Sequence, residues 1–431
     1  MTASPTRVAP SARRLTGSLR DVGYSFEAAV ADLIDNSITA GATRVSVDVR
    51  FAGRDSWVLI ADNGSGMDSA GLDEALRFGS QRAYGRGDLG RYGLGLKTAS
   101  LSQCRRVSVY SRNPDTGHVD GRCLDLDFID RVDDWMIVDP DDAELEERVH
   151  GLLDSPTGTV VAWQNLDRLL PAKNPDGSWA RKKFSGATER LAQHLETVFH
   201  RFLSGEAHRS ISISVNGESL TPWDPFARDE SATKLISNDI LEVGTGLGSG
   251  KVSLRAYCLP SRSQFSSLEN FERTAGPRKW NRQQGIYVYR ADRLVQWGGW
   301  DGIRTIDEHT KLARVALDFD TDLDDEFNIN VAKMRVNIPH QLKKMMGRAV
   351  ADVCAEADSR YRKDQKSSTS ATGTADSPAA QDRDQADLPD AADLGLALKS
   401  AAARSGNYAA FREISRILHE ESPELAKRLG L

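Results

Sequence analysis

Two side chains in one predicted helix have the types and spacing that nucleotide chemistry requires. Asp32 and Asn36 lie four residues apart in the segment ADLIDN, after a possible N-cap at Ser25. Residues with this spacing share one face of a helix, so the carboxylate and the amide point the same way. A carboxylate can activate water as a general base, and an amide oxygen can bind Mg²⁺. Taken alone, the pattern is equally typical of a solvated helix face.

A second motif, DNGSGM, begins at Asp62, directly after an apolar strand expected over residues 57–61. An aspartate at a strand end can accept a hydrogen bond from an exocyclic amine such as that of adenine. Gly64 and Gly66 allow the backbone to approach a ligand closely, and Met67 follows them. An ordinary strand-to-helix turn is the alternative, whereas a calcium loop would need further acidic residues and a closing Glu.

A third motif, GRYGLGLKT, covers residues 90–98 at the end of a glycine-rich stretch. Gly90, Gly93 and Gly95 leave backbone amides free to surround phosphate groups, and Lys97 supplies a cation nearby. The glycine spacing differs from that of a Walker A loop. The motif also does not follow the first strand of a βαβ unit, as a dinucleotide-binding fingerprint does. A flexible surface loop is the alternative interpretation.

In this order, the three motifs resemble those of the GHKL ATPases, and the segment GTVV, with Thr159 at the start of a strand, extends the resemblance. The resemblance implies an α/β fold, the Bergerat sandwich, in which helices cover one face of a mixed sheet and ATP is bound. It implies that Asp32 is the general base, that Asn36 binds Mg²⁺ and that Asp62 binds adenine. The other implied nucleotide contacts are Gly64, Gly66, Met67, Gly90, Gly93, Gly95, Lys97 and Thr159.

The general base of this family is usually Glu, whereas this chain has Asp32. Aspartate is one methylene shorter, so its carboxylate reaches roughly 1.5 Å less far, and a misplacement of that size can cost about 100-fold in rate. We therefore expect ATP hydrolysis to be slow. A nucleotide-binding pseudoenzyme is an alternative.

The resemblance extends to a second, transducer-like α/β domain, in which the segments GIYVYR and RLVQW predict a strand, a turn and a second strand. In the family, a lysine from this domain reaches the γ-phosphate. By resemblance this is Lys333, with Arg335 as the competing residue and a surface lysine as the alternative. A polar segment then predicts a disordered linker before a helical tail. The expected segments are residues 1–170 (ATP-binding), 171–364 (transducer-like), 365–390 (linker) and 391–431 (tail).

Composition limits the possible classes of protein. The formal charge of −6 over 431 residues excludes a uniformly basic nucleic-acid binder. No apolar run approaches the roughly 18 residues needed to span a bilayer. The four cysteines lack metal-ligand spacing and predict reduced thiols in a cytoplasmic protein. The segment 273–282 combines four basic residues with Trp280, which suits phosphate contact with base stacking, or a solvated loop.

Within the GHKL class, these versions of the motifs look like those of the MORC and MutL families. That resemblance implies an Mg²⁺-dependent ATPase that forms a homodimer through its N-terminal domain when ATP binds. The closed dimer would clamp DNA, in repair or in defence against foreign DNA. The alternative is a chaperone-like switch that acts on protein partners through the tail, residues 391–431.

Overall fold

The computed structural model describes residues 10–79, 89, 95–245, 248–329 and 336–371, and residues 411, 413, 415, 416, 419 and 426 near the C-terminus. The chain divides into two compact units, Met1–Thr369 and Ser370–Leu431. The described residues of the second unit are helical, as the tail was expected to be. No helix within the described ranges is long and apolar enough to cross a membrane.

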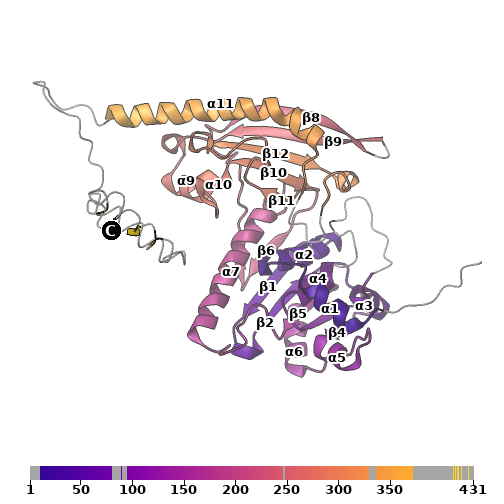
Figure 1. Ribbon diagram of the computed structural model, residues 1–431. Helices are drawn as coiled ribbons and strands as arrows, with labels where there is room; N and C mark the ends of the chain where they lie inside the picture. Colours follow the sequence, from indigo (N-terminus) through magenta and orange to yellow (C-terminus); the bar gives the residue numbers. More distant parts are fainter. Residues whose placement is uncertain are drawn as a thin grey trace, which may run out of the picture. The chain divides into compact units, whose positions relative to one another are not determined.

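The first unit contains two sheets, and we call the parts built on them the first and the second lobe (Figure 1). In the described residues, the sheet of the first lobe has the strand order β4-β3-β5-β2-β1-β6-β7. Its neighbours are antiparallel except β1 and β6, which are parallel. The strands are β1 (Arg44–Arg50), β2 (Trp57–Asp62), β3 (Arg106–Arg112), β4 (Val119–Asp125), β5 (Gly158–Gln164), β6 (Ser212–Val215) and β7 (Glu218–Ser219).

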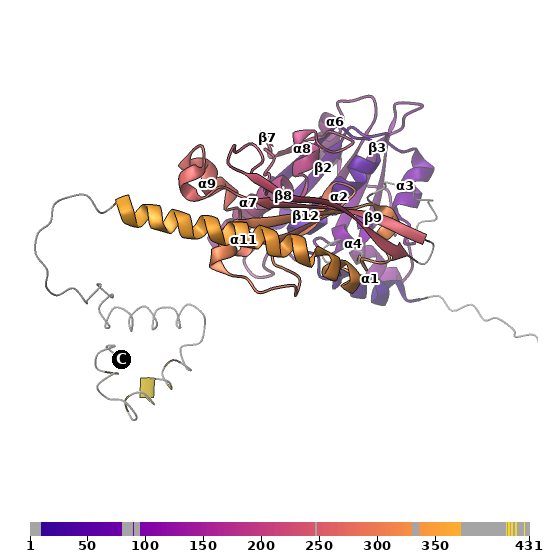
Figure 2. The same ribbon diagram turned by 90° about the horizontal axis from the view of Figure 1, so that it is seen from above.

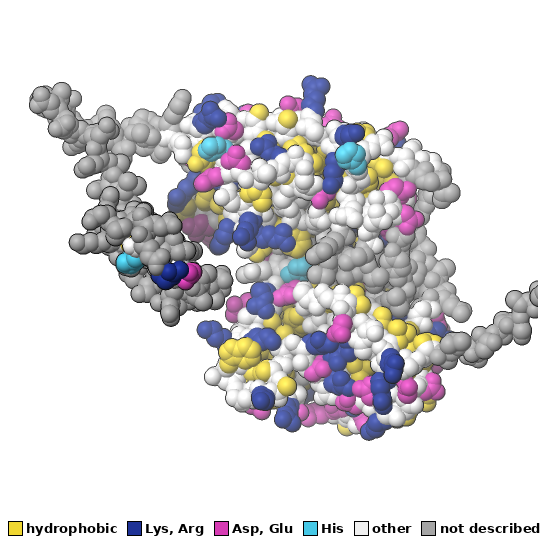
Figure 3. Space-filling model, viewed as in Figure 1, with side chains coloured by type: hydrophobic (Ala, Val, Ile, Leu, Met, Phe, Trp, Pro, Cys, Tyr) yellow, Lys and Arg dark blue, Asp and Glu magenta, His cyan; other side chains and the backbone are white. Residues whose placement is uncertain are grey.

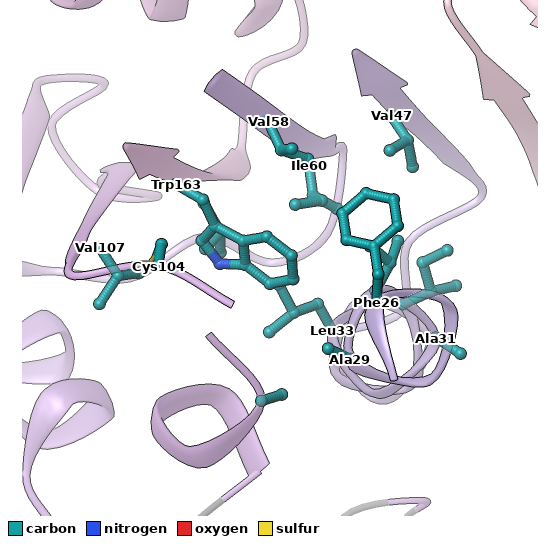
Figure 4. Close-up of a cluster of buried hydrophobic side chains, with 14 of the residues drawn as sticks. Phe26, Ala29, Ala31, Leu33, Val47, Val58, Ile60, Cys104, Val107 and Trp163 are labelled. Carbon is teal, nitrogen blue, oxygen red and sulfur yellow. The ribbon is translucent and has the colours of Figure 1, made fainter. Parts of the chain in front are cut away.

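Helix α2 (Phe26–Thr39) lies at the centre of the main core of the first lobe. It begins where predicted, because the Ser25 hydroxyl oxygen accepts a hydrogen bond from the Ala28 N–H at 3.2 Å. Phe26 and Leu33 face Trp163 and other apolar side chains of the sheet (Figure 4). The remaining helices on this side are α1 (Ala12–Arg20), α3 (Ser69–Leu76), α4 (Gly95–Leu101), α5 (Leu126–Val132), α7 (Ser178–Val198) and α8 (His200–Ser204).

Helix α6 (Ala143–Leu152) corrects the expectation that helices cover only one face of this sheet. Its Leu145 and Val149 are buried in a separate cluster with Leu59 and Val160, on the face opposite α2. The reason is that β2 and β5 are apolar at successive positions, and successive strand residues point to opposite faces. Both faces of these central strands therefore require a cover.

The first lobe also continues past residue 170, where the ATP-binding domain was expected to end. Helix α7 packs against α2, and β6 pairs in parallel with β1. A parallel pair needs a long crossover connection, and α7 and α8 lie within the connection that leads to β6. The boundary between the lobes therefore lies after β7, which ends at Ser219.

The sheet of the second lobe has the order β11-β10-β12-β9-β8 in the described residues. β10 and β12 are parallel and the other neighbours antiparallel. Helix α11 (His340–Ala371) lies along one face of this sheet (Figure 2) and buries Leu342, Met346 and Val353 there. The other elements are β8 (Lys234–Thr245), β9 (Gly248–Cys258), α9 (Leu268–Thr274), α10 (Lys279–Gln283), β10 (Gly285–Arg290), β11 (Arg293–Trp297) and β12 (Ala313–Phe319).

Helix α11 continues beyond the point at which the linker was expected to begin. Residues 365–371 are helical, and the Gln365 side-chain amide donates to the Tyr361 hydroxyl, one turn earlier, at 3.0 Å. The polar composition of this stretch predicts a linker, but a helix that is already anchored by packing propagates at one hydrogen bond per residue.

Candidate nucleotide site

Helix α2 presents Asp32 and Asn36 in different environments. Asp32 is only 2% exposed, and the Tyr24 hydroxyl donates a hydrogen bond to its Oδ2 at 3.1 Å. Asn36, one turn later, is half-buried, and no hydrogen bond joins its side-chain amide to a residue in the described ranges. The helix thus combines a buried carboxylate with a half-buried asparagine.

Tyr24 connects Asp32 to helix α4. Its hydroxyl also hydrogen bonds with the Thr98 side chain, and burial and the charge of Asp32 together raise the pKa of Tyr24 well above its usual value. The phenol therefore remains a donor to Asp32 at any physiological pH. Gly95 lies so close that a Cβ there would be 2.6 Å from Asp32 Oδ2, so no larger residue fits without displacing the carboxylate. Of the three predicted phosphate glycines, Gly95 is thus placed beside the proposed base.

Asp62 ends β2 and is held by donors from three segments. Its carboxylate accepts hydrogen bonds from the Ser37 hydroxyl and the Gly64 N–H, both at 2.8 Å, and from the Thr159 backbone N–H. Burial raises the pKa of Asp62, and these three donors oppose that effect. The carboxylate is therefore fixed in orientation, as a group that recognises one ligand atom must be.

Ser111, at the end of β3, joins Thr159 to the DNGSGM turn. Its Oγ is 3.0 Å from Thr159 Oγ1 and accepts a hydrogen bond from the Met67 N–H at 2.8 Å. Gly66 has a φ of +68°, and a Cβ there would come within 2.2 Å of the Arg112 carbonyl oxygen. The turn is thus pressed against the ends of β3 and β5, and it requires glycine at this position.

Lys97 is neither on the surface nor directed at the residues just described. It is 2% exposed, and its Nζ donates to the Ala75 carbonyl in the last turn of α3 at 3.0 Å. Burial lowers the pKa of Lys97 to about 8. A cation at a helix C-terminus is stabilised by the free carbonyls there. The predicted phosphate contact would require Lys97 to leave this bond.

The buried Lys97 leads to a prediction about stability and pH. Because the pKa of Lys97 falls from 10.5 to about 8 on folding, the unfolded chain binds more protons between these two pH values. The contribution of Lys97 to stability therefore rises with pH across that window. Relative to Lys97→Met, the wild type should gain about 2 kcal/mol of unfolding free energy between pH 7 and 9.5. Urea unfolding at the two pH values measures this difference. Lys344→Met, at an exposed position on α11, is the control and should follow the wild type.

Two arginines of the second lobe reach the first lobe from one hairpin. Arg290 and Arg293 flank a two-residue turn in which Ala291 and Asp292 have φ values of 44° and 67°, the combination found in type I′ hairpins. Arg293 donates to the Asp35 carboxylate on α2 at 2.8 Å, and the two side chains are only 4% and 0% exposed. Nothing local in the sequence indicates this pair.

Arg290 reaches the glycine-rich stretch that contains the third motif. It makes two hydrogen bonds of 2.7 Å to the Asp324 carboxylate and donates to the Leu89 carbonyl at 3.1 Å. Leu89 directly precedes the third motif and is 3% exposed. The same hairpin therefore contacts both α2 and this stretch. Gly90, Gly93, Lys333 and Arg335 lie outside the described residues.

The described residues contain no group of three or more His, Cys, Asp or Glu side chains that could hold a metal ion. The amide oxygen of the half-buried Asn36, beside a buried carboxylate, fits a metal that takes most of its ligands from phosphates and water. The residues of this site therefore fit Mg²⁺ that binds together with a nucleotide.

Comparison with known proteins identifies the same region. The model of the family "Histidine kinase-, DNA gyrase B-, and HSP90-like ATPase" matches residues 24–159. This range contains Tyr24, Asp32, Asn36, Asp62 and Thr159, so it covers both ends of the site.

Similar proteins extend the match beyond this domain. The DNA mismatch repair protein MutL of Neisseria meningitidis serogroup B is 23% identical over 245 residues, which are 55% of this chain and 33% of MutL. MutL of Actinobacillus succinogenes is 25% identical over 213 residues, 48% of this chain and 29% of that protein. Protein MICRORCHIDIA 6 of Arabidopsis thaliana is 38% identical over 90 residues, 20% of this chain and 14% of that protein.

The match spans at most a third of the length of these relatives, so the comparison characterises a shared region rather than a whole protein. Within that region, the matched range and the positions of Asp32, Asn36, Asp62 and Thr159 agree. Residues 24–159 form a GHKL ATPase domain, similar to those of the MutL and MORC proteins.

Proposed function

We propose that this chain is a cytoplasmic, Mg²⁺-dependent ATP switch whose first lobes associate when ATP binds and separate after slow hydrolysis. One observation carries the proposal. Asp35 lies on α2 between Asp32 and Asn36 and forms a buried ion pair with Arg293 of the second lobe. A displacement of α2 on nucleotide binding would therefore be transmitted directly to the second lobe through this ion pair, as a switch requires.

The described residues have distinct roles in this proposal. Asp62 accepts a hydrogen bond from the adenine amino group, and the Ser111–Thr159 pair keeps the adjoining turn in place. Asn36 supplies an oxygen to Mg²⁺, which neutralises phosphate charge when bound with ATP. Asp32 accepts the proton of the attacking water, and Tyr24 orients its carboxylate.

Most of the residues that we propose to contact the phosphates lie outside the described part of the chain. Gly90, Gly93 and Gly95 surround the phosphates with backbone amides. Lys333, with Arg335 as the competing residue, reaches the γ-phosphate from the second lobe. Hydrolysis is slow because Asp32 is shorter than the glutamate usual in the family.

A size measurement tests the switch. With Mg²⁺ and a non-hydrolysable ATP analogue, light scattering should show association that is absent or weaker without nucleotide. The association that depends on the analogue should disappear in Asp62→Ala, because that variant removes the carboxylate that accepts the hydrogen bond from adenine. Asp48→Asn, on the neighbouring strand β1, serves as the control and should behave like the wild type. A chain that remains a monomer in saturating analogue would exclude ATP-driven dimerisation.

DNA is the proposed substrate of the closed state, in repair or in defence against foreign DNA. Two of the relatives are named as DNA mismatch repair proteins. In addition, Lys and Arg side chains gather where the second lobe borders the hollow between the lobes (Figure 3). Lys279 and Arg282 of α10 are exposed and are the candidates for phosphate contact.

The structure changes the expected roles of two neighbouring residues. The Trp280 ring stacks on Phe271 with 4.6 Å between ring centroids, so it does not form an open platform for a base. Arg278 donates to the Trp297 carbonyl at 2.6 Å and lies over the Trp297 ring, so it supports the fold. Phosphate contact without base stacking is what the remaining exposed cations allow.

The second candidate is a chaperone-like switch on protein partners, acting through residues 391–431. Salt-dependent DNA retention separates the two candidates. A clamp should lose affinity when Lys279 and Arg282 are both replaced by Ala, and the slope of log affinity against log salt should decrease by roughly two. The matched control replaces two exposed cations of α11, Lys344 and Arg348. Equal DNA binding by all three proteins would favour protein partners.

A further inference from the structure

Strand β8 is the outer strand of the second sheet and has no neighbour on its outer side within the described residues (Figure 1). It is 12 residues long and contains no proline. Its side chains are mostly exposed, with Ile240 at 71% and Leu235 at 51%. Long exposed edges with apolar side chains are templates for pairing with a further strand, and native proteins usually protect them.

The two exposed apolar side chains of β8 lie on the same face of the sheet. Leu235 pairs with Tyr257 of β9, and Ile240 pairs with Ser253. Tyr257 and Ser253 are four apart on β9, so they and the residues paired with them face the same way. Leu235 and Ile240 are five apart on β8, and they share a face because the bulge between Leu235 and Ser237 adds one residue. The bulge therefore places Leu235 and Ile240 on one face, with Asn238 between them, instead of turning one of them away.

The sequence of β8 is self-complementary about Asn238. It reads KLISNDILE over residues 234–242. Counted on their partners in β9, which allow for the bulge, Leu235 lies two positions before Asn238 and Ile240 lies two positions after it. Two copies paired antiparallel about a twofold axis at Asn238 therefore place Leu235 of one copy opposite Ile240 of the other, on the face that these side chains share. Apolar cross-strand pairs stabilise antiparallel strands.

We propose that a second copy of this chain binds along β8, so that the two second-lobe sheets continue through a twofold axis at Asn238. This contact does not require a nucleotide and therefore goes beyond the ATP-dependent association of the first lobes. Two copies held at β8 would stay together when the first lobes separate. The ATP-dependent contact would then form within one dimer, at a high effective concentration, so the ATP analogue raises the mass of the wild type only at protein concentrations too low for β8 to pair.

A cysteine on the proposed twofold axis tests the register. Directly opposed residues have Cα atoms about 4.5–5.5 Å apart, within the range that a disulfide spans. Asn238→Cys should therefore give a covalent dimer under mild oxidation without nucleotide, and the native cysteines are all buried. In the same pairing, the two copies of residue 242 are about 27 Å apart, so the control Glu242→Cys should stay monomeric on a non-reducing gel. Absence of the Asn238→Cys dimer, or equal amounts from both variants, would overturn the proposal.

The full-length wild type should sediment as a dimer without nucleotide at micromolar concentration. Ile240→Lys should raise its dissociation constant by roughly tenfold or more, because a charge replaces an apolar side chain in the pairing. Ile240 is exposed, so the variant should fold. Ile306→Lys, at an apolar position 50% exposed in the same lobe, is the matched control and should remain a dimer. A monomeric wild type, or equal dissociation constants for both variants, would contradict pairing at β8.

The same variant separates this proposal from the proposed ATP switch. In Ile240→Lys, the nucleotide-free protein should be a monomer, and the ATP analogue should still drive association through the first lobe. If the analogue has no effect in this background, the ATP switch fails while β8 pairing stands. If the nucleotide-free variant is still a dimer, β8 pairing fails while the ATP switch is untouched.

Discussion

Replacing Asp32 by Asn should lower kcat for ATP hydrolysis by at least about 100-fold, the effect expected for a lost general base. The amide has nearly the same shape and can still accept the Tyr24 hydrogen bond, but it cannot take a proton from water. ATP affinity should therefore stay within a factor of about three of the wild type. Steady-state phosphate release gives the rate, and calorimetry with a non-hydrolysable analogue gives the affinity.

Two further variants test whether Tyr24 only positions the carboxylate. Tyr24→Phe removes the hydrogen bond to Asp32 and should lower kcat by roughly tenfold, less than loss of the base itself. Asp32→Glu restores the family's residue, yet Gly95 and the Tyr24 hydroxyl occupy the space that a longer side chain needs. It should therefore fail to accelerate hydrolysis unless Tyr24→Phe is combined with it. Phosphate release that is the same in the wild type and in Asp32→Asn would instead support a nucleotide-binding pseudoenzyme.

The parts of the fold that could be predicted are those with local signals. The N-cap at Ser25 and the apolar period after it predict α2 almost to the residue. The apolar runs that end at Asp62 and begin at Gly158 predict β2 and β5 in the same way. Strand β8 was not predicted at all. Its residues are largely exposed on both faces, so the alternation that reveals a half-buried strand is missing.

The site residues also divide into those with a local sequence signal, which were predicted, and those without one. Asp32, Asn36 and Asp62 stand in short motifs, whereas their partners are distant in the sequence. Ser37 contacts Asp62 across 25 residues, and Ser111 contacts Thr159 across 48. Arg293 contacts Asp35 across 258 residues. No single-sequence pattern encodes such pairings, because they depend on how the two sheets and α2 pack.

The Asp35–Arg293 pair should make the largest single contribution to stability between the lobes. Arg293→Met leaves the buried Asp35 carboxylate without this partner, and breaking a buried pair in this way costs about 3–5 kcal/mol. Urea unfolding of the full chain measures the loss. Arg255→Met is the matched control, because Arg255 pairs with Asp318 at 2.9 Å but is 32% exposed. Exposed pairs contribute about 0–1 kcal/mol, so this variant should unfold close to the wild type.

A double variant separates stability from communication between the lobes. Replacing both partners of a buried pair by apolar residues is often nearly neutral, so Asp35→Leu with Arg293→Met should recover most of the lost unfolding free energy. It should nevertheless lose the nucleotide response of the second lobe, because no charge then links α2 to the β10–β11 hairpin. In the wild type, the ATP analogue should change amide hydrogen exchange in β10 and β11, and the double variant should not show this change. If the restored protein still protects this hairpin on binding the analogue, the signal reaches the second lobe by another route, with the Arg290–Leu89 contact as the next to be tested.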